Sequence, residues 1–165
     1  MHTKYTSLYM DIADRISHMS QATRLKVGSV IVKDNRILSY GWNGMPTGWD
    51  NNCEHKEYKN PDWTGIDPNT FVPFDDLYPF EDENGRYRLV TNPEVLHSEM
   101  NALMKVAQST ESTKDATMFC THAPCIHCAK AIHQAGISVV YYKNDYRSTD
   151  GKEFLIRSGV VVHQY

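Results

Sequence analysis

A histidine, a glutamate and two cysteines at metal-site spacing constrain this chain more than any other feature. His97 stands two residues before Glu99, and Pro124 introduces Cys125 and Cys128 further along the chain. One imidazole and two thiolates suit a zinc ion, and three protein ligands leave the fourth tetrahedral position open to water. An open position is typical of a catalytic zinc, since water bound there ionises near neutral pH. The spacing therefore predicts one catalytic zinc ion, with Glu99 free to carry protons.

The residues before His97 have the chemistry of a helix start. Asn92 suits an N-cap, Pro93 a first helical position and Glu94 a first turn. Apolar residues then recur at helical spacing. We therefore predict a helix over about 93–107 that carries the His97 motif near its start.

A second helix is predicted over about 125–135, with Gly136 as its C-terminal cap. Cys125 and Cys128 are three residues apart and so share one face of this helix. The positive partial charge of a helix start favours thiolates there. His127 is turned away from that face and is not counted as a ligand.

Each part of this pattern also has a simpler interpretation. Cys125 and Cys128 alone could be a redox pair or half of a four-ligand structural zinc site. Glu99 could be a first-turn acid that only favours the helix dipole. A closed four-ligand site would make the protein a non-enzymatic, zinc-stabilised binding module. The presence of His97 beside Glu99 favours the catalytic interpretation.

The two metal-site segments are similar to those of the zinc-dependent cytidine and deoxycytidylate deaminases. Three stretches, KVGSVIV at 26–32, GWNGMP at 41–46 and HSEMNA at 97–102, resemble the phage-type deoxycytidylate (dCMP) deaminases of that superfamily. Two positions depart from the family pattern, because Trp42 stands in place of Tyr and Ser98 in place of Ala. The resemblance runs from about residue 26 to the C-terminus.

The element pattern predicts a three-layer α/β fold, and the resemblance makes it cytidine-deaminase-like. Strands and helices alternate after a first hairpin, so we expect a central five-stranded mixed sheet flanked by helices, with parallel strands near the C-terminus. The first helix, over 8–19, has a predicted apolar face of Leu8, Ile12, Ile16 and Met19. The later elements are expected as strands at 27–32, 36–42, 116–121, 137–142 and 160–163, and a short helix at 152–157.

We expect a single domain over 1–165, with an insertion at about 50–90. The inserted stretch is rich in Pro, Gly, Asn and Asp and is too long for a simple loop. Asn84-Gly85 predicts a small hairpin inside it, and Asp34-Asn35 predicts the turn of the first hairpin.

The resemblance implies hydrolytic deamination of dCMP to dUMP and ammonia, a reaction that feeds thymidylate synthesis. Glu99 would take a proton from the zinc-bound water, give one to N3 of the pyrimidine and deliver one to the leaving amine. One zinc ion per chain is expected. Some phage-type relatives carry a second, structural zinc, of whose ligands only Cys53 and His55 have counterparts here.

Substrate contacts are assigned chiefly by the resemblance. Asn43 would bind a sugar hydroxyl, although a turn residue bonded to its own backbone is the alternative. Tyr146 would stack on the base, and the Ala123 backbone would reach the base edge. The weaker candidates are Thr47 and His122, the latter equally explained as a loop residue.

The phosphate requires a cation near the site. Four cations are available at its predicted edges, and Lys26 ranks first among them, against the alternative of a solvated charge at a strand end. The other three are Arg24, Lys143 and Arg147.

Regulation is implied by the resemblance alone. The family is typically activated by dCTP and inhibited by dTTP, with Mg²⁺ on the triphosphate. Its effector segment, at a subunit interface, corresponds here to Gly41, Trp42, Asn43 and Gly44. A homohexamer is the expected assembly.

Charge and cysteine usage narrow the partner and the compartment. The net charge is −3 over 165 residues, which argues against a nucleic-acid partner because such proteins present basic faces. A tRNA adenosine deaminase or other polynucleotide deaminase is therefore the weaker alternative. Four cysteines, no apolar leader and no bilayer-length apolar run predict a cytoplasmic protein without a membrane partner, in the host cytoplasm if it is phage-encoded.

Overall fold

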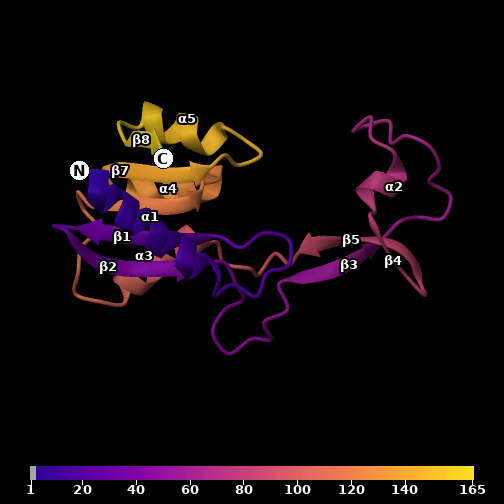
Figure 1. Ribbon diagram of the computed structural model, residues 1–165, viewed down its shortest axis with the longest axis horizontal. Coiled ribbons are helices and arrows are strands. Elements are labelled where there is room, and N and C mark those ends of the chain that lie inside the picture. Colours follow the sequence, from indigo (N-terminus) through magenta and orange to yellow (C-terminus); the bar gives the residue numbers. More distant parts are fainter. Residues whose placement is uncertain (1–2) are drawn as a thin grey trace.

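The computed structural model describes residues 3–165 and is built on a five-stranded sheet in the order β2-β1-β6-β7-β8 (Figure 1). β1 pairs antiparallel with both β2 and β6, whereas β6, β7 and β8 are parallel. The predicted mixed sheet and its parallel C-terminal strands are therefore confirmed. The strand bounds are β1 Gly28–Lys33, β2 Arg36–Trp42, β6 Thr117–His122, β7 Val139–Asn144 and β8 Val161–Gln164.

Helices cover both faces of this sheet. Alternate residues of β1 point to opposite faces, so Val30 and Val32 belong to one apolar cluster and Ile31 to the other. The first cluster contains residues of α1 (Thr3–Ser17); the second contains residues of α3 (Ser98–Ala107), α4 (Ile126–Gln134) and α5 (Asp150–Arg157). The predicted three-layer order is confirmed. No helix within residues 3–165 has the length and apolar character needed to span a bilayer.

The first hairpin turns as its sequence predicts. Asp34 and Asn35 both have positive φ, at 49° and 60°. Two central residues in the left-handed region make the turn that matches the twist of hairpin strands, and Asp and Asn tolerate that region best after Gly.

The buried face of α1 differs from the predicted one. Leu8 and Met19 are exposed, at 48% and 55%, while Ala13 is fully buried. A Cβ at Gly28 would lie 2.1 Å from the carbonyl oxygen of Ala13 and 2.6 Å from the backbone nitrogen of Ser17. The buried face of the helix is instead formed by Tyr9, Met10 and Ala13. The close approach to Gly28 requires a small residue at position 13, which sets the rotation of the helix against the sheet.

The predicted start of the catalytic helix near Pro93 is also wrong, because α3 begins at Ser98 with His97 as its N-cap. Leu96 forms an antiparallel bridge with Gly44, with N–H···O distances of 3.1 and 2.9 Å. This bridge keeps the backbone extended up to the helix. Asn92 instead donates through its side-chain amide to the carbonyl of Asn52.

The stretch expected as an insertion holds a second, three-stranded antiparallel sheet, in the order β3-β5-β4, that extends away from the main sheet (Figure 1). Its elements are β3 Glu54–Tyr58, α2 Phe74–Leu77, β4 Phe80–Asp82 and β5 Gly85–Thr91. Asp82 pairs with Gly85, whose φ is 116°, so the predicted hairpin at Asn84-Gly85 is confirmed. The division of residues 1–165 into one domain with an insertion stays a prediction, and residues 1–2 lie outside the described part.

A close approach between β2 and α3 yields a test of the fold. A Cβ at Gly41 would lie 2.2 Å from the carbonyl oxygen of Ser98 and 2.6 Å from the backbone nitrogen of Ala102. Gly41→Ala should therefore push α3 away and lower the free energy of unfolding by about 1–3 kcal/mol. Thermal unfolding of the purified variant measures this loss.

Gly44→Ala is the matched control. A Cβ there meets only the Trp42 ring, at an ordinary 3.7 Å. We expect its melting temperature to stay near that of the parent. Equal melting temperatures for both variants would contradict the close approach.

Candidate active site

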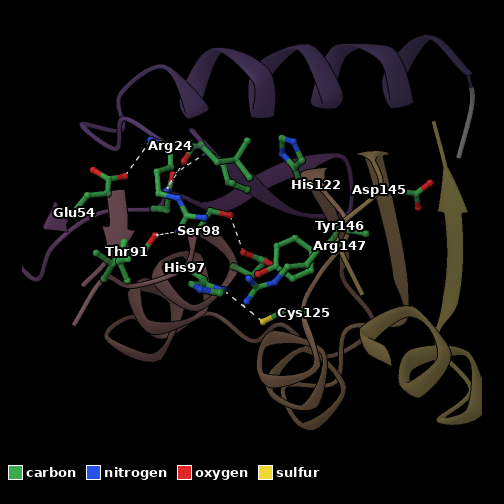
Figure 2. Close-up of a pocket in the computed structure, with 17 residues that line it drawn as sticks. Arg24, Glu54, Thr91, His97, Ser98, His122, Cys125, Asp145, Tyr146 and Arg147 are labelled. Atoms are coloured by element: carbon green, nitrogen blue, oxygen red, sulfur yellow. Dashed lines mark hydrogen bonds between the residues drawn. The ribbon is translucent and has the colours of Figure 1, made fainter. Parts of the chain in front are cut away.

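Two helix starts bring the three predicted zinc ligands together. His97 is the N-cap of α3, Cys125 is the N-cap of α4, and Cys128 lies in the first turn of α4. The Nδ1 atom of His97 lies 3.5 Å from the Cys125 sulfur and 3.4 Å from the Cys128 sulfur, and Figure 2 shows the imidazole beside Cys125. Among residues 3–165 these form the one group of three or more potential ligands that meet, with all ligand atoms within 4.8 Å.

The donor set fits zinc. Zinc binds sulfur at about 2.3 Å and nitrogen at about 2.0 Å in a tetrahedron, so its nitrogen and sulfur ligands lie roughly 3.5 Å apart. The two nitrogen–sulfur distances at His97 match that value. Three ligand side chains and an adjoining cleft suit an open, catalytic site more than a closed, structural one.

Hydrogen bonds among the three ligand side chains shift their pKa values. A hydrogen bond from the Cys128 thiol is the main cause that lowers the pKa of Cys125, and the same bond raises the pKa of Cys128. The pKa of His97 is raised chiefly by its hydrogen bond to Cys125. One thiol of the pair therefore holds a proton that a metal ion must displace.

Glu99 lies beside the zinc ligands and is buried from solvent. Only 4% of it is exposed, and burial raises the pKa of its carboxyl above the usual range. Its Oε2 accepts a hydrogen bond from the Ser98 hydroxyl at 2.8 Å. A carboxyl with a raised pKa can both take and give a proton near neutral pH. The alternative of a merely dipole-favouring surface acid does not fit this burial.

A cavity of about 680 Å³ opens beside Glu99 and His97. It gathers residues from the end of β2, the segment before β1, the base of the insertion and the segments after β6 and β7 (Figure 2). Four of the six predicted substrate residues line it, namely Asn43, His122, Ala123 and Tyr146. The structure does not bring Lys26 or Thr47 to this cavity, and both are exposed.

Two arginines supply the positive charge of the cavity. Arg24 and Arg147 line it, and the Arg147 guanidinium lies 5.5 Å from the centre of the Tyr146 ring. Lys143 does not line the cavity and instead pairs with Asp14 at 3.2 Å. Of the four cations predicted near the site, Arg24 and Arg147 are therefore the two that line the cavity and could contact a phosphate there.

The Asn43 amide is already used by the backbone. Its Oδ1 accepts from the Val27 N–H at 2.7 Å, and its Nδ2 donates to the Leu25 carbonyl at 2.8 Å. These bonds go to a segment 16 and 18 residues away, so they are not the local turn bonding considered from the sequence. Each atom retains a second hydrogen-bonding site, so contact with a sugar stays a prediction.

His122 is the last residue of β6, Ala123 follows it, and both line the cavity. Burial lowers the pKa of His122, so its ring is neutral at pH 7. The Ala123 N–H donates to the Asn144 carbonyl at 2.8 Å. Any backbone contact from Ala123 to a base therefore falls to its carbonyl oxygen.

The base of the insertion contributes a wall that sequence reasoning missed. The buried carboxylate of Glu54 accepts from the backbone N–H groups of Thr23 and Arg24 at 3.1–3.2 Å. The Arg24 guanidinium donates to the Thr91 hydroxyl at 3.1 Å. These partners are 30 to 67 residues apart, so no local pattern could have indicated them.

The remaining expected site residues lie elsewhere. Cys53 is buried and contacts the Asn51 carbonyl, and His55 bonds to Asn92. Neither belongs to a group of three potential ligands in the described chain. In the expected effector segment, Trp42 stacks on Tyr40.

Comparisons with known proteins agree with this geometry. The model of the cytidine and deoxycytidylate deaminase zinc-binding region matches residues 3–144. The chain belongs to this family. It is 31% identical to a deoxycytidylate deaminase of Enterobacteria phage T4 over 163 residues, 92% of this chain and 84% of the relative. It is 29% identical to ComE operon protein 2 of Bacillus subtilis, covering 97% of this chain and 70% of that protein.

Solved structures extend the comparison to the fold. A dCMP deaminase from the cyanophage S-TIM5, in complex with dCMP and dUMP, is 39% identical with a TM-score of 0.77, over 100% of this chain and 99% of that one. A bifunctional deaminase/reductase from Thermotoga maritima is 19% identical with a TM-score of 0.63, over 99% of this chain and 37% of that one, and shows the fold alone. The predicted cytidine-deaminase-like fold is confirmed.

Zinc affinity should rise with pH. Zinc must displace the proton shared by the Cys125–Cys128 pair and, at lower pH, the proton of His97, whose pKa is raised. We expect the apparent affinity to increase about 10-fold to 100-fold per pH unit below neutrality. Competition with a chelator at several pH values measures it.

His127→Ala is the matched control for zinc binding. Its position lies between the two cysteines but outside the ligand group. This variant should keep about one zinc per chain, whereas His97→Ala should lose it. Zinc loss in His127→Ala would contradict the assigned ligand set.

Proposed function

We propose that this protein is a zinc-dependent hydrolase that deaminates dCMP to dUMP and ammonia. The observation that carries the proposal is the buried Glu99 beside His97 and the cysteine pair, at the wall of a cavity with two arginines. The cavity volume of about 680 Å³ is in the range of small-molecule sites. The similarity to the phage deoxycytidylate deaminases supports the choice of nucleotide.

The chemistry assigns the proton transfers to Glu99. Zinc, when bound by His97, Cys125 and Cys128, supplies a Lewis acid that ionises water near neutral pH. Glu99 takes the proton that the water loses and gives it to N3 of the pyrimidine, which makes C4 electrophilic. The hydroxide oxygen then bonds to C4. Glu99 takes the remaining proton of that hydroxyl and gives it to the amine, so the C4–N bond breaks, the C4=O group forms and ammonia leaves.

The substrate contacts follow from the lining of the cavity. The Ala123 carbonyl would accept from the amino group of the base, while Tyr146 would stack on the ring. His122, neutral and half-buried, would lie at the same edge. Asn43 would bind the sugar through the hydrogen-bonding sites that the backbone leaves unused. Arg24 and Arg147 would hold the phosphate.

Replacing Glu99 tests the mechanism. Glu99→Gln keeps the size of the side chain but cannot carry a proton, so kcat for dCMP should fall by about 100-fold or more. Zinc content should stay at that of the parent, because Glu99 is not a ligand. The loss of ultraviolet absorbance as dCMP becomes dUMP measures kcat. Glu94→Gln, at an exposed position, is the control, and a near-normal kcat for Glu99→Gln would refute the assignment.

Replacing the cations tests the substrate class. Arg24→Ala should lower kcat/KM for dCMP by about 10-fold to 100-fold, since a charge-assisted contact to phosphate is lost, and leave deoxycytidine almost unaffected. Lys26→Ala is the comparison, because that residue is exposed and outside the cavity. If kcat/KM for dCMP fell only in Lys26→Ala, the phosphate contact would be assigned to Lys26 instead. Equal kcat/KM for nucleotide and nucleoside in the parent would exclude a nucleotide substrate.

Regulation and assembly are proposed on the family resemblance. The protein would form a homohexamer that dCTP with Mg²⁺ activates and dTTP inhibits, through Gly41, Trp42, Asn43 and Gly44, with activity feeding thymidylate synthesis in the cytoplasm. Such effectors must bind the active and inactive states unequally. Sedimentation and dCMP saturation curves with each triphosphate test this, and an unchanged curve would contradict it.

A further inference from the structure

A chain of buried hydroxyl groups connects Glu99 to the interior of the sheet. The Ser98 hydroxyl donates to Oε2 of Glu99 at 2.8 Å and lies 2.6 Å from the Ser29 hydroxyl. The Ser29 hydroxyl in turn lies 3.5 Å from the Cys120 sulfur. Ser98, Ser29 and Cys120 are all fully buried. They belong to α3, β1 and β6, so three elements meet behind one carboxylate.

The proton-transfer role makes a specific demand on Glu99. One carboxylate oxygen must face the reacting atoms, and a side chain with three rotatable bonds does not hold that direction unaided. Ser98 occupies Oε2, which leaves Oε1 for proton transfer, and the backbone N–H of Glu99 also donates to the carboxylate. The direction of Oε1 is then set by a contact outside the substrate.

We propose that Ser98, held by Ser29, is a positioning residue that fixes the orientation of the Glu99 carboxylate. The inference rests on the proposed function.

The hydrogen-bonding capacity of the two hydroxyls supports the role of Ser29. A serine hydroxyl has one hydrogen to donate and two acceptor sites. When Ser98 donates its hydrogen to Glu99, the short contact to Ser29 requires Ser29 to donate its single hydrogen to Ser98 and not to the more distant Cys120 sulfur. Ser29 lies in β1, which pairs with a strand on each side and is buried along five of its six residues. This rigid strand therefore sets the direction in which the Ser98 hydroxyl points.

Removing the hydroxyl of Ser98 should impair chemistry and spare binding. In zinc-loaded Ser98→Ala, kcat for dCMP should fall by about 10-fold, the effect of losing one hydrogen bond to a charged group. KM and zinc content should stay at the parent values, because neither the substrate nor the metal loses a contact. The substitution removes a single oxygen atom from a buried side chain and adds no bulk, so the variant should fold.

Double variants separate positioning from mere packing. Ser29→Ala should also lower kcat, and Ser29→Ala/Ser98→Ala should be no worse than Ser98→Ala alone, since both act through one contact. In a Glu99→Gln background, Ser98→Ala should leave the residual kcat unchanged. Ser39→Ala is the matched control, because Ser39 is buried and donates to the Ala102 carbonyl on α3 at 2.8 Å, outside the Glu99 chain.

The possible results separate the positioning role from the proposed function. If the zinc-loaded parent protein does not deaminate dCMP, the proposed function itself is wrong. An active parent with an unchanged kcat in Ser98→Ala would overturn only the positioning role. That role is also overturned if Ser98→Ala lowers kcat equally in the Glu99→Gln background, or if Ser39→Ala produces an equal loss, since packing alone would then explain the effect.

Discussion

The active site depends on two helix starts that are held against each other at one edge of the main sheet. β6 and β7 run parallel, so the segments that follow them, with Ala123 and Tyr146, emerge at the same edge. Because β1 runs antiparallel to β6, the residue that precedes β1, Val27, lies at that edge too. The zinc ligands, Glu99 and the residues that line the cavity therefore meet at this edge.

Close backbone contacts hold the start of α3 in this position. Gly41 lets β2 touch the first turn of α3, and the Gly44–Leu96 bridge holds His97 at the helix start. Glu99 is buried in the same helix turn, and removing a carboxylate from water costs stability unless it is paired or protonated. The hydroxyl of Ser98 offsets part of this cost. Stability and catalysis thus compete at one residue, as is common in active sites.

Sequence reasoning succeeded where the signal is local and failed where distant segments compete. The Asp34-Asn35 turn and the spacing of Cys125 and Cys128 depend on neighbours a few residues away, and both were predicted correctly. The apolar face of α1 and the start of α3 were not. Each depends on a contact with a distant strand or segment, at Gly28 for α1 and at Gly44 for α3. Periodicity and capping signals carry no information about such contacts.

The sequence by itself determined the ligand types, the acid beside them and the nature of the metal, because side-chain chemistry and spacing within one helix turn are local properties. Only the tertiary structure decided that Arg24, and not Lys26, faces the cavity. It also decided that Ser29 meets Ser98, 69 residues further along the chain. Strand register and the distance between helix and sheet determine which side chains face the cavity and which distant residues meet. Both are set only when the whole chain packs.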